Sequence, residues 1–375
     1  MITDDLLSKD RMDALASLLA PFGPRRPLGE LVYRVNQLFH ACEAADYDRR
    51  HSEIHEQLPG VWRQLIGVAA TSPPAEGWTI LDFGCGTGFA SLQLLQALPA
   101  TSIRRLVCFD PSPEMLARCR RKVAPQFACA EFASDHAELW GAGSRQFNLL
   151  ATNSVLHHLP DPFATLRELE PQLSPGCIWL AGHEPSRRYY ANAACRQALS
   201  AYRRSQKWRR RLSARHWLRR LRSWLGGRKS PAAETARRCV ATGLFAAPPS
   251  PGVIDRLVDF HVPHGVPRGA DAASCGGFDV ESLHQGLGEA WALEWFHSYS
   301  FLGRYYEASL PPYWAGVARR LADDYPLDGA TFCTAWRFEP ARSPHGPDTQ
   351  DTPRQREDAG HASPGNLTVW GVGRR

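Results

Sequence analysis

The sequence of 375 residues lacks any apolar run long enough to span a membrane. Its first twenty residues carry six charged side chains, where a signal peptide would have an apolar core. These two features predict a cytoplasmic protein. The hydrophobic share of 43% is enough for one large core, or for a core with a helical subdomain beside it.

Paired cysteines of the form C-x-x-C are also missing. The ten cysteines fall largely within apolar runs, where cysteine behaves as a small buried hydrophobe. This distribution predicts reduced thiols, with neither a zinc site nor a disulfide framework. His261 and His264 have a spacing found in metal sites, but Pro263 stands between them and no third ligand is near. We therefore predict a loop contact there and no metal site.

Acidic residues are absent from residues 187–229, which contain 15 Lys or Arg. The rest of the chain has 29 basic and 38 acidic residues, so the formal net charge of +6 comes from one positive patch. The pattern predicts helices over 191–211 and 214–225, with Ser213 capping the second. Three interpretations stay open: a lid with solvated arginines, a contact with an anionic membrane surface or acidic carrier protein, or a contact with nucleic acid.

Residues 79–89, TILDFGCGTGF, predict a short buried strand, a glycine turn and the start of a helix. Such a turn brings backbone N–H groups and the positive end of a helix dipole to one point, and glycine lets a ligand approach the main chain. Gly84, Gly86 and Gly88 recur at every second position, unlike the dinucleotide fingerprint G-x-G-x-x-G. Asp82 before them suits a cofactor with a cationic amino-acid part.

A second strand-like run, 105–109, ends at Asp110. A carboxylate in this position can accept hydrogen bonds from both hydroxyls of a ribose. Ser112 or Pro113 then opens another helix.

At these residues the chain resembles the class I S-adenosylmethionine-dependent methyltransferases. The first motif of that family is similar to residues 81–88, and its acid after the second strand is similar to Asp110. Asn148 departs from the family, which often has an acid before the fourth strand. The resemblance covers about residues 77–184, including the segments 149–159 and 173–180.

The resemblance implies S-adenosylmethionine as the cofactor. It also implies that Tyr47 and Asp48 belong to an N-terminal lid over the cofactor, although a solvated helix face with Tyr47 in the core is an equal alternative. The implied cofactor-binding residues are Tyr47, Asp82, Gly84, Cys85, Gly86, Thr87, Gly88, Asp110, Pro111, Met115, Glu131 and Asn153.

Alternating strand and helix patterns predict an α/β fold, a Rossmann-like doubly wound sheet with helices on both faces. Two strands near the end of the chain complete seven, and the resemblance implies that the last is antiparallel. The expected strands are 79–83, 105–109, 126–129, 147–152, 177–181, 294–302 and 330–338. The expected domains are an N-terminal helical lid (1–75), a cofactor-binding core (76–186), a basic helical insertion after the fifth strand that caps the substrate (187–290), C-terminal strands (291–340) and a disordered tail (341–375). Within the insertion, 231–277 is expected to be irregular except for a helix near 253–261.

Methyl transfer from a sulfonium is an in-line displacement that needs an aligned acceptor and removal of the acceptor's proton. A neutral histidine suits this task near neutral pH. Candidates for the base are His158, with His157 beside it, and His183 or Glu184 after the fifth strand. The remaining candidates are His40, Tyr47 and His51, and proximity alone is a further possibility.

These features predict a methyltransferase for a small molecule, lipophilic or carrier-bound substrates included. One alternative is a nucleic-acid methyltransferase, but Asn153 is followed by Ser-Val-Leu and not by the Pro-Pro-Tyr type of motif that stacks a flipped base. The other is a non-catalytic scaffold that keeps the nucleoside site and acts through its arginine-rich helices.

Overall fold

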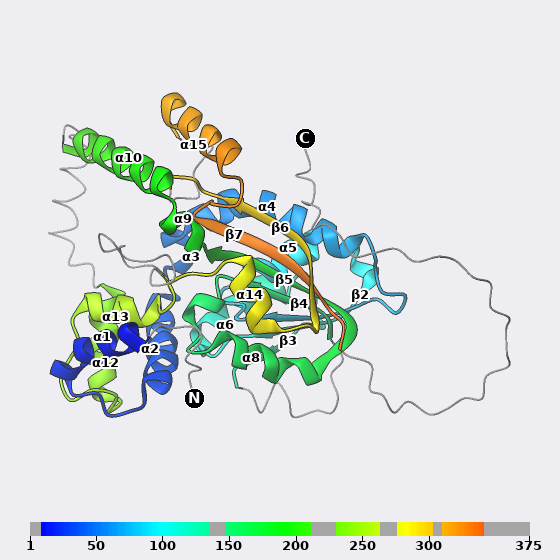
Figure 1. Cartoon of the computed structure of the whole chain (residues 1–375). Coiled ribbons are helices and arrows are strands. Elements are labelled where there is room, and N and C mark those ends of the chain that lie inside the picture. Colours follow the sequence, from blue (N-terminus) through cyan, green and yellow to red (C-terminus); the bar gives the residue numbers. More distant parts are fainter. Residues whose placement is uncertain (1–8, 136–146, 212–229, 263–275, 303–309, 341–375) are drawn as a thin grey trace, which may run out of the picture. The chain divides into compact units, whose positions relative to one another are not determined.

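The computed structural model describes residues 9–135, 147–211, 230–262, 276–302 and 310–340 (Figure 1). Residues 1–340 form one compact unit. The predicted tail and the predicted second basic helix, 214–225, lie outside the described residues.

Seven strands form one sheet in the order β3-β2-β1-β4-β5-β7-β6. The first five run parallel, and β7 is antiparallel to both β5 and β6. This confirms the predicted α/β fold with an antiparallel last strand. The strands are β1 (Trp78–Phe83), β2 (Ile103–Phe109), β3 (Glu131–Ala133), β4 (Phe147–Asn153), β5 (Leu173–Pro185), β6 (Trp291–Tyr299) and β7 (Thr331–Phe338).

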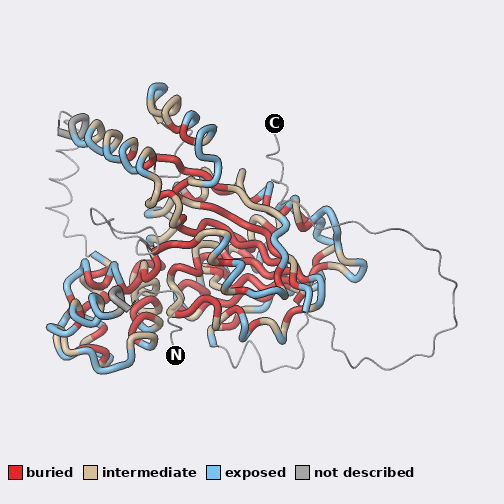
Figure 2. The backbone as a smooth tube through the Cα atoms, viewed as in Figure 1, coloured by how far each residue is buried: buried red, intermediate tan, exposed pale blue. Residues whose placement is uncertain are grey.

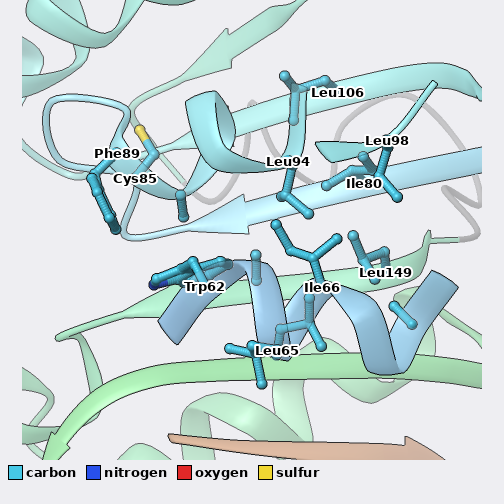
Figure 3. Close-up of a cluster of buried hydrophobic side chains, with 14 of the residues drawn as sticks. Trp62, Leu65, Ile66, Ile80, Cys85, Phe89, Leu94, Leu98, Leu106 and Leu149 are labelled. Atoms are coloured by element: carbon cyan, nitrogen blue, oxygen red, sulfur yellow. The ribbon is translucent and has the colours of Figure 1, made fainter. Parts of the chain in front are cut away.

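Helices cover both faces of the sheet. Successive side chains of a strand point to opposite faces, so each strand contributes to two apolar cores. Ile80 joins the core on one face and Leu81 the core on the other. One face is covered by α4 (Ser52–Ala70), α5 (Phe89–Ala97) and α6 (Pro113–Val123), and the other by α8 (Pro162–Leu169) and α14 (Val280–Leu287). Figure 3 shows Trp62, Leu65 and Ile66 of α4 against the strands.

A second group of helices has its own apolar core. It contains α1 (Lys9–Leu19), α2 (Leu28–Glu43), α12 (Pro231–Ala241) and α13 (Pro251–Val258). Figure 1 shows these segments together although they are far apart in the sequence, and Figure 2 shows a buried layer between them. The expected lid region is therefore divided, because α2 packs with α12 and α13 whereas α4 packs on the sheet.

Residues 231–262 are more regular than predicted. The helix expected near 253–261 corresponds to α13, but the segment expected to be irregular before it contains a further helix, α12. In α12 the buried side chains are Ala232, Thr235, Ala236 and Cys239. The prediction was wrong because this face has helical spacing but is made of small residues, which do not stand out as an apolar stripe.

The strand expected over 126–129 is also wrong. After α6 the chain turns, with the amides of Gln126 and Phe127 both donating to Val123 O. The strand β3 begins only at Glu131, and Val107 of β2 is its partner in register. Glu131 therefore opens the strand instead of following it.

The predicted basic helix over 191–211 is present as one helix that begins two residues later, and a short helix precedes it. A short helix, α9 (Arg187–Ala191), ends before α10 (Ala193–Arg211), whose first amides are capped by Asn192 Oδ1 at 2.8 Å from Ala194 N. Cys195 and Leu199 of α10 share an apolar cluster with α15 (Pro312–Asp324). No helix in the described residues is long and apolar enough to cross a membrane.

The cysteines agree with the expectation that most of them are buried. Nine lie within the described residues, all of them free, and seven of these are buried. Cys85, Cys108 and Cys119 belong to the core cluster beneath the glycine turn.

Asp279 caps α14 with both halves of a capping box, since its Oδ1 accepts from Ser282 N at 2.7 Å and Ser282 Oγ accepts from Asp279 N. We expect Asp279→Ala to lower the free energy of unfolding by about 1 kcal/mol. Ser250 stands at the same position of α13 without a side-chain cap bond, so Ser250→Ala should cost less than about 0.5 kcal/mol. Equal losses in urea unfolding would contradict the assigned cap.

Candidate active site

A cavity of about 740 Å³ lies beyond the carboxyl ends of the central strands. Its floor is formed by the turns after β1, β2 and β4, and its other walls by α2, α3 (Tyr47–Arg50), α4 and α8. This edge of a parallel sheet is where α/β proteins bind ligands. The α2 helix is held over the turn after β2 by Gln37 Nε2, which donates to Pro111 O at 2.7 Å.

Two glycines of the turn after β1 allow close approach to neighbouring parts of the chain. Gly84 has φ +70°, and a Cβ on it would lie 2.6 Å from Val155 Cγ2. Gly88 instead faces α6, where a Cβ would lie 2.9 Å from Cys119 Sγ. Gly84 therefore serves the approach of the two turns, whereas Gly88 serves helix packing.

Asp110 connects the turn after β1 with the turn after β2. Its Oδ2 accepts from Gly86 N at 2.8 Å and its Oδ1 accepts from Ser112 N at 2.9 Å. Burial raises the pKa of Asp110, and these amide donors oppose the shift. The carboxylate lines the cavity with lone pairs left over for a ligand.

Asp82 is fully buried, and its Oδ2 accepts from Ser91 N at 2.9 Å and from Ser91 Oγ at 2.5 Å. Burial raises its pKa to about 8. The residue lines the cavity, but its hydrogen bonds tie α5 to the end of β1. A direct contact with the amino group of a cofactor stays a prediction.

Asp48 joins the N-terminal helices to the glycine turn. Its carboxylate accepts from Thr87 Oγ1 at 2.7 Å and pairs with Lys122 Nζ at 2.6 Å and His55 Nε2 at 3.1 Å. Burial opposes its ionisation, but the bonds from His55, Lys122 and Thr87 outweigh burial and hold the pKa of Asp48 well below its usual range. Tyr47 beside it lines the cavity.

A second cavity, of about 480 Å³, adjoins the first. The two share wall residues, among them His40, Tyr47, Ser154 and His158. Charged and titratable side chains line the second cavity: His40, Glu43, His51, His157, His158, His183, Arg203, Asp255 and Asp259.

Backbone strain is concentrated at the second cavity. In the described part of the chain, three residues other than glycine have positive φ: Ser154 (59°), His183 (62°) and Ser300 (67°). All three line this cavity. Such conformations cost energy and cluster at functional sites, so the strain marks the second cavity as part of the site.

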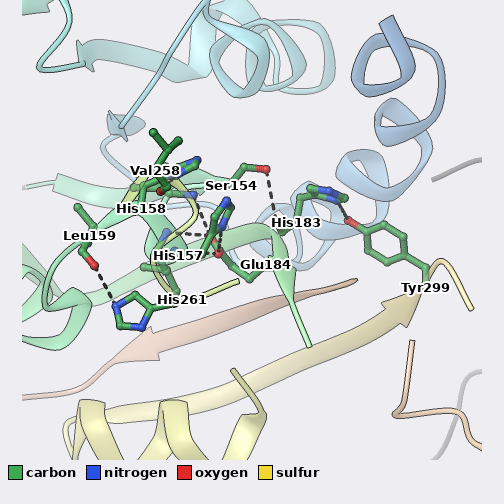
Figure 4. A network of polar contacts seen from close by, with 11 residues as sticks. Ser154, His157, His158, Leu159, His183, Glu184, Val258, His261 and Tyr299 are labelled. Carbon is green, nitrogen blue, oxygen red and sulfur yellow. Dashed lines mark hydrogen bonds and ion pairs between the residues drawn. The ribbon is translucent and has the colours of Figure 1, made fainter. Parts of the chain in front are cut away.

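Glu184 is fully buried and organises the turn after β4 (Figure 4). It accepts from the amides of Val155 at 2.9 Å, Leu156 at 3.0 Å and His157 at 3.3 Å. Its Oε2 also lies 2.8 Å from His157 Nδ1. With four donors and no exposure, Glu184 positions His157 and the turn, which argues against its predicted role as a base.

His158 and His183 are held differently. His158 Nδ1 lies 2.7 Å from Val258 O, and since a carbonyl only accepts, Nδ1 carries the proton and Nε2 keeps its lone pair. Burial lowers the pKa of His158 well below its usual value. His183 Nδ1 lies 2.7 Å from Tyr299 Oη, and burial lowers its pKa to about 3. Both rings are therefore neutral near pH 7.

A family model described as a methyltransferase domain matches residues 80–176. Trans-aconitate 2-methyltransferase of Azoarcus sp. (strain BH72) is 30% identical over 35% of this chain and 47% of that protein. Malonyl-(acyl-carrier protein) O-methyltransferase of Paenibacillus sp. (strain JDR-2) is 27% identical over 38% and 51%. Residues 80–176 form a methyltransferase domain, in agreement with the resemblance of the glycine turn and Asp110.

Other similarities lie outside the small-molecule methyltransferases or show only a distant likeness. The tRNA U34 carboxymethyltransferase of Aliarcobacter butzleri is 29% identical over 24% of this chain and 28% of that protein. The match to the structure of the plantazolicin methyltransferase BpumL with SAH spans 83% of this chain and 99% of the BpumL chain, at 12% identity and a TM-score of 0.39. The chain spans about half the length, or less, of the curated relatives it matches.

Most predicted cofactor residues of the methyltransferase domain line the first cavity. These are Tyr47, Asp82, Gly84, Cys85, Gly86, Thr87, Asp110, Pro111, Met115 and Asn153. Gly88 and Glu131 do not. Gly88 packs against Cys119 of α6, and Glu131 opens β3 and pairs on the surface with Arg105. Tyr33, Asn36 and Gln37 of α2 also line this cavity and were not predicted, because their segment shows only the spacing of a packing helix.

The catalytic candidates are distributed over the two cavities. His158 lies in the wall that both share, and His183 lines only the second. His261, for which a loop contact was predicted, belongs to the scaffold, since its amide donates to His157 O at 3.0 Å and its Nε2 lies 3.0 Å from Leu159 O. His264 lies outside the described residues.

Gly84→Ala should weaken binding of S-adenosylhomocysteine, the demethylated cofactor, because its Cβ would push the turns after β1 and β4 apart. Gly176 is the control, with φ +80° but no atom within 4 Å of the place a Cβ would take, so both variants carry the cost of a positive φ, about 1–2 kcal/mol, in stability. Calorimetric titration should show weaker binding for Gly84→Ala alone. Equal affinities would contradict the assignment.

Asp48→Ala should release the N-terminal helices from the glycine turn and weaken binding of S-adenosylhomocysteine by about 5- to 10-fold, mainly through faster dissociation. Asp46→Ala removes a neighbouring carboxylate that pairs on the surface with Arg49, and should change affinity by less than about twofold. Stopped-flow dissociation rates measure both. A rate that is the same for Asp48→Ala and wild type would exclude a lid role for this contact.

Proposed function

We propose that the chain is an S-adenosylmethionine-dependent methyltransferase that acts on a small molecule. The observation that carries the proposal is the pair of adjoining cavities, one at the methyltransferase-domain turns and the other lined by histidines. The first takes the cofactor, with the ribose at Asp110 and the methionine part near Asn153. The second takes the acceptor, because its volume of about 480 Å³ suits a small molecule.

Methyl transfer would take place at the wall that the two cavities share. A methyl group of a cofactor in the first cavity would face the second cavity past Ser154 and His158. In the displacement, an electron pair of the acceptor forms the new bond to the methyl carbon. The bond from that carbon to sulfur breaks with its electrons staying on sulfur, which becomes a neutral thioether. We assign activation of the acceptor to His158, through the lone pair of Nε2.

Carrier-bound substrates are compatible with this arrangement. Arg203 of α10 lines the second cavity, and Arg196 and Arg204 of the same helix are exposed. These cations would attract an acidic carrier or an anionic acceptor. A contact with a membrane surface through residues 187–229 depends on residues outside the described ones and stays a prediction.

Incubation with methyl-labelled cofactor and a cell extract, fractionated by size and charge, tests the function. We expect label in small molecules or on an acidic carrier protein. Label in RNA would favour the rival nucleic-acid function suggested by the basic helix α10. Cofactor binding without any transfer would favour the scaffold interpretation, and the absence of cofactor binding would contradict the proposed function.

Asp110→Ala supplies the matched variant for this experiment. It should abolish transfer and weaken binding of S-adenosylhomocysteine by more than about 10-fold, because the carboxylate is expected to bind the ribose. Glu131→Ala removes an acid that was expected in the site but lies outside the cavity. This variant should bind S-adenosylhomocysteine as tightly as wild type does. The opposite pattern would overturn the placement of the cofactor.

A further inference from the structure

We propose that the second cavity contains a site for a divalent transition-metal ion, formed by His157, His158 and Asp259. One potential ligand atom of each residue lies within 4.8 Å of the other two. The ligand set comes from distant parts of the sequence, since the histidines follow β4 and Asp259 follows α13. This inference rests on the proposed function and replaces the expectation that the protein has no metal site.

Both imidazoles are held as metal ligands are usually held. Histidines that bind metals donate the proton of their other nitrogen to a carboxylate or a backbone carbonyl, which sets the tautomer and the ring orientation. His157 does this with Glu184 Oε2 at 2.8 Å, and His158 with Val258 O at 2.7 Å. Each ring therefore has Nε2 left for an ion.

The third ligand is brought to the histidines by a dense set of backbone contacts. His261 N donates to His157 O, and the amide of Asn36 bridges Leu257 O at 3.1 Å and His158 O at 3.4 Å. These bonds fasten the end of α13 to the turn after β4. Asp259 is thereby held beside the two rings, and small side-chain rotations would bring the three atoms to the separations of about 3 Å that an ion needs.

The ligand types select the ion. Two imidazole nitrogens and one carboxylate oxygen suit Zn²⁺, Fe²⁺ or Co²⁺, whereas Mg²⁺ and Ca²⁺ prefer sites made of oxygen atoms. Three protein ligands also leave a coordination position open, as in catalytic zinc sites. His158 lies in the wall shared by the two cavities, so that position can face the acceptor.

Such an ion would determine the class of acceptor. A hydroxyl oxygen that binds to the ion loses its proton to water and stays an anion near neutral pH. A carboxyl oxygen bound to the ion is likewise an anion. The oxygen then attacks the methyl carbon as the bond to sulfur breaks. An ion in this site would restrict the proposed reaction to O-methylation. It would bind the lone pair of His158 Nε2, so that the ion and not His158 would activate the acceptor.

Titration of the full-length protein with Co²⁺, followed by visible absorption, tests the site directly. We expect one Co²⁺ per chain, displaced by Zn²⁺ and not by Mg²⁺. His158→Ala and Asp259→Asn should each weaken binding by more than about 100-fold, since even outer partners of metal ligands cost about 10- to 100-fold. Asp255→Asn is the control, because Asp255 lines the same cavity outside the ligand group, and should bind Co²⁺ as wild type.

S-adenosylhomocysteine titrations of the same samples separate this inference from the proposed function. Variants that bind the product normally but not Co²⁺ support the site. Two results would overturn the metal site and leave the proposed function intact. In the first, wild type binds the product but not Co²⁺; in the second, Asp259→Asn binds Co²⁺ as tightly as wild type. Failure of wild type to bind the product would contradict the proposed function itself.

Once an acceptor is found, a chelator should abolish methyl transfer and Zn²⁺ should restore it. Transfer that is insensitive to the chelator would reject the metal site.

Discussion

Hydrogen bonds from backbone amides to buried carboxylates hold the carboxyl edge of this sheet in place. Asp110 accepts from Gly86 and Ser112, and Glu184 accepts from three consecutive amides after β4. A buried carboxylate is costly unless donors compensate it, and amides in a turn are costly without acceptors. The two requirements are met together, so the turns that form the floor of the first cavity are rigid before a ligand arrives.

Hydrogen bonds to backbone carbonyls attach the insertion to the sheet. The end of α13 reaches the turn after β4 through His158, His261 and Asn36, which contact backbone carbonyls across about one hundred residues of sequence or more. Because carbonyl groups accept but do not donate, these bonds also set the tautomer of His158. The bond that attaches α13 therefore also decides which nitrogen of His158 keeps its lone pair.

Much of the fold was predictable because the apolar pattern of a segment agrees with the burial of that segment in the structure. The strands β1, β2 and β4 are short apolar runs, and each is buried on both faces of the sheet as such runs require. The errors occur where the local pattern was weak. The helix α12 buries small residues, and β3 is only three residues long, so a shift of its predicted position moved Glu131 from the start of the strand to its end.

The sequence by itself determined the glycine turn, the acid after the second strand and the order of the strands along the chain, because each depends on neighbours within a few residues. Only the tertiary structure decided that Glu184 is a buried acceptor, that α2 and α13 share a core, and that Asp259 stands beside His157 and His158. These relations join residues far apart along the chain. They depend on how whole helices pack, and no local spacing in the sequence records that.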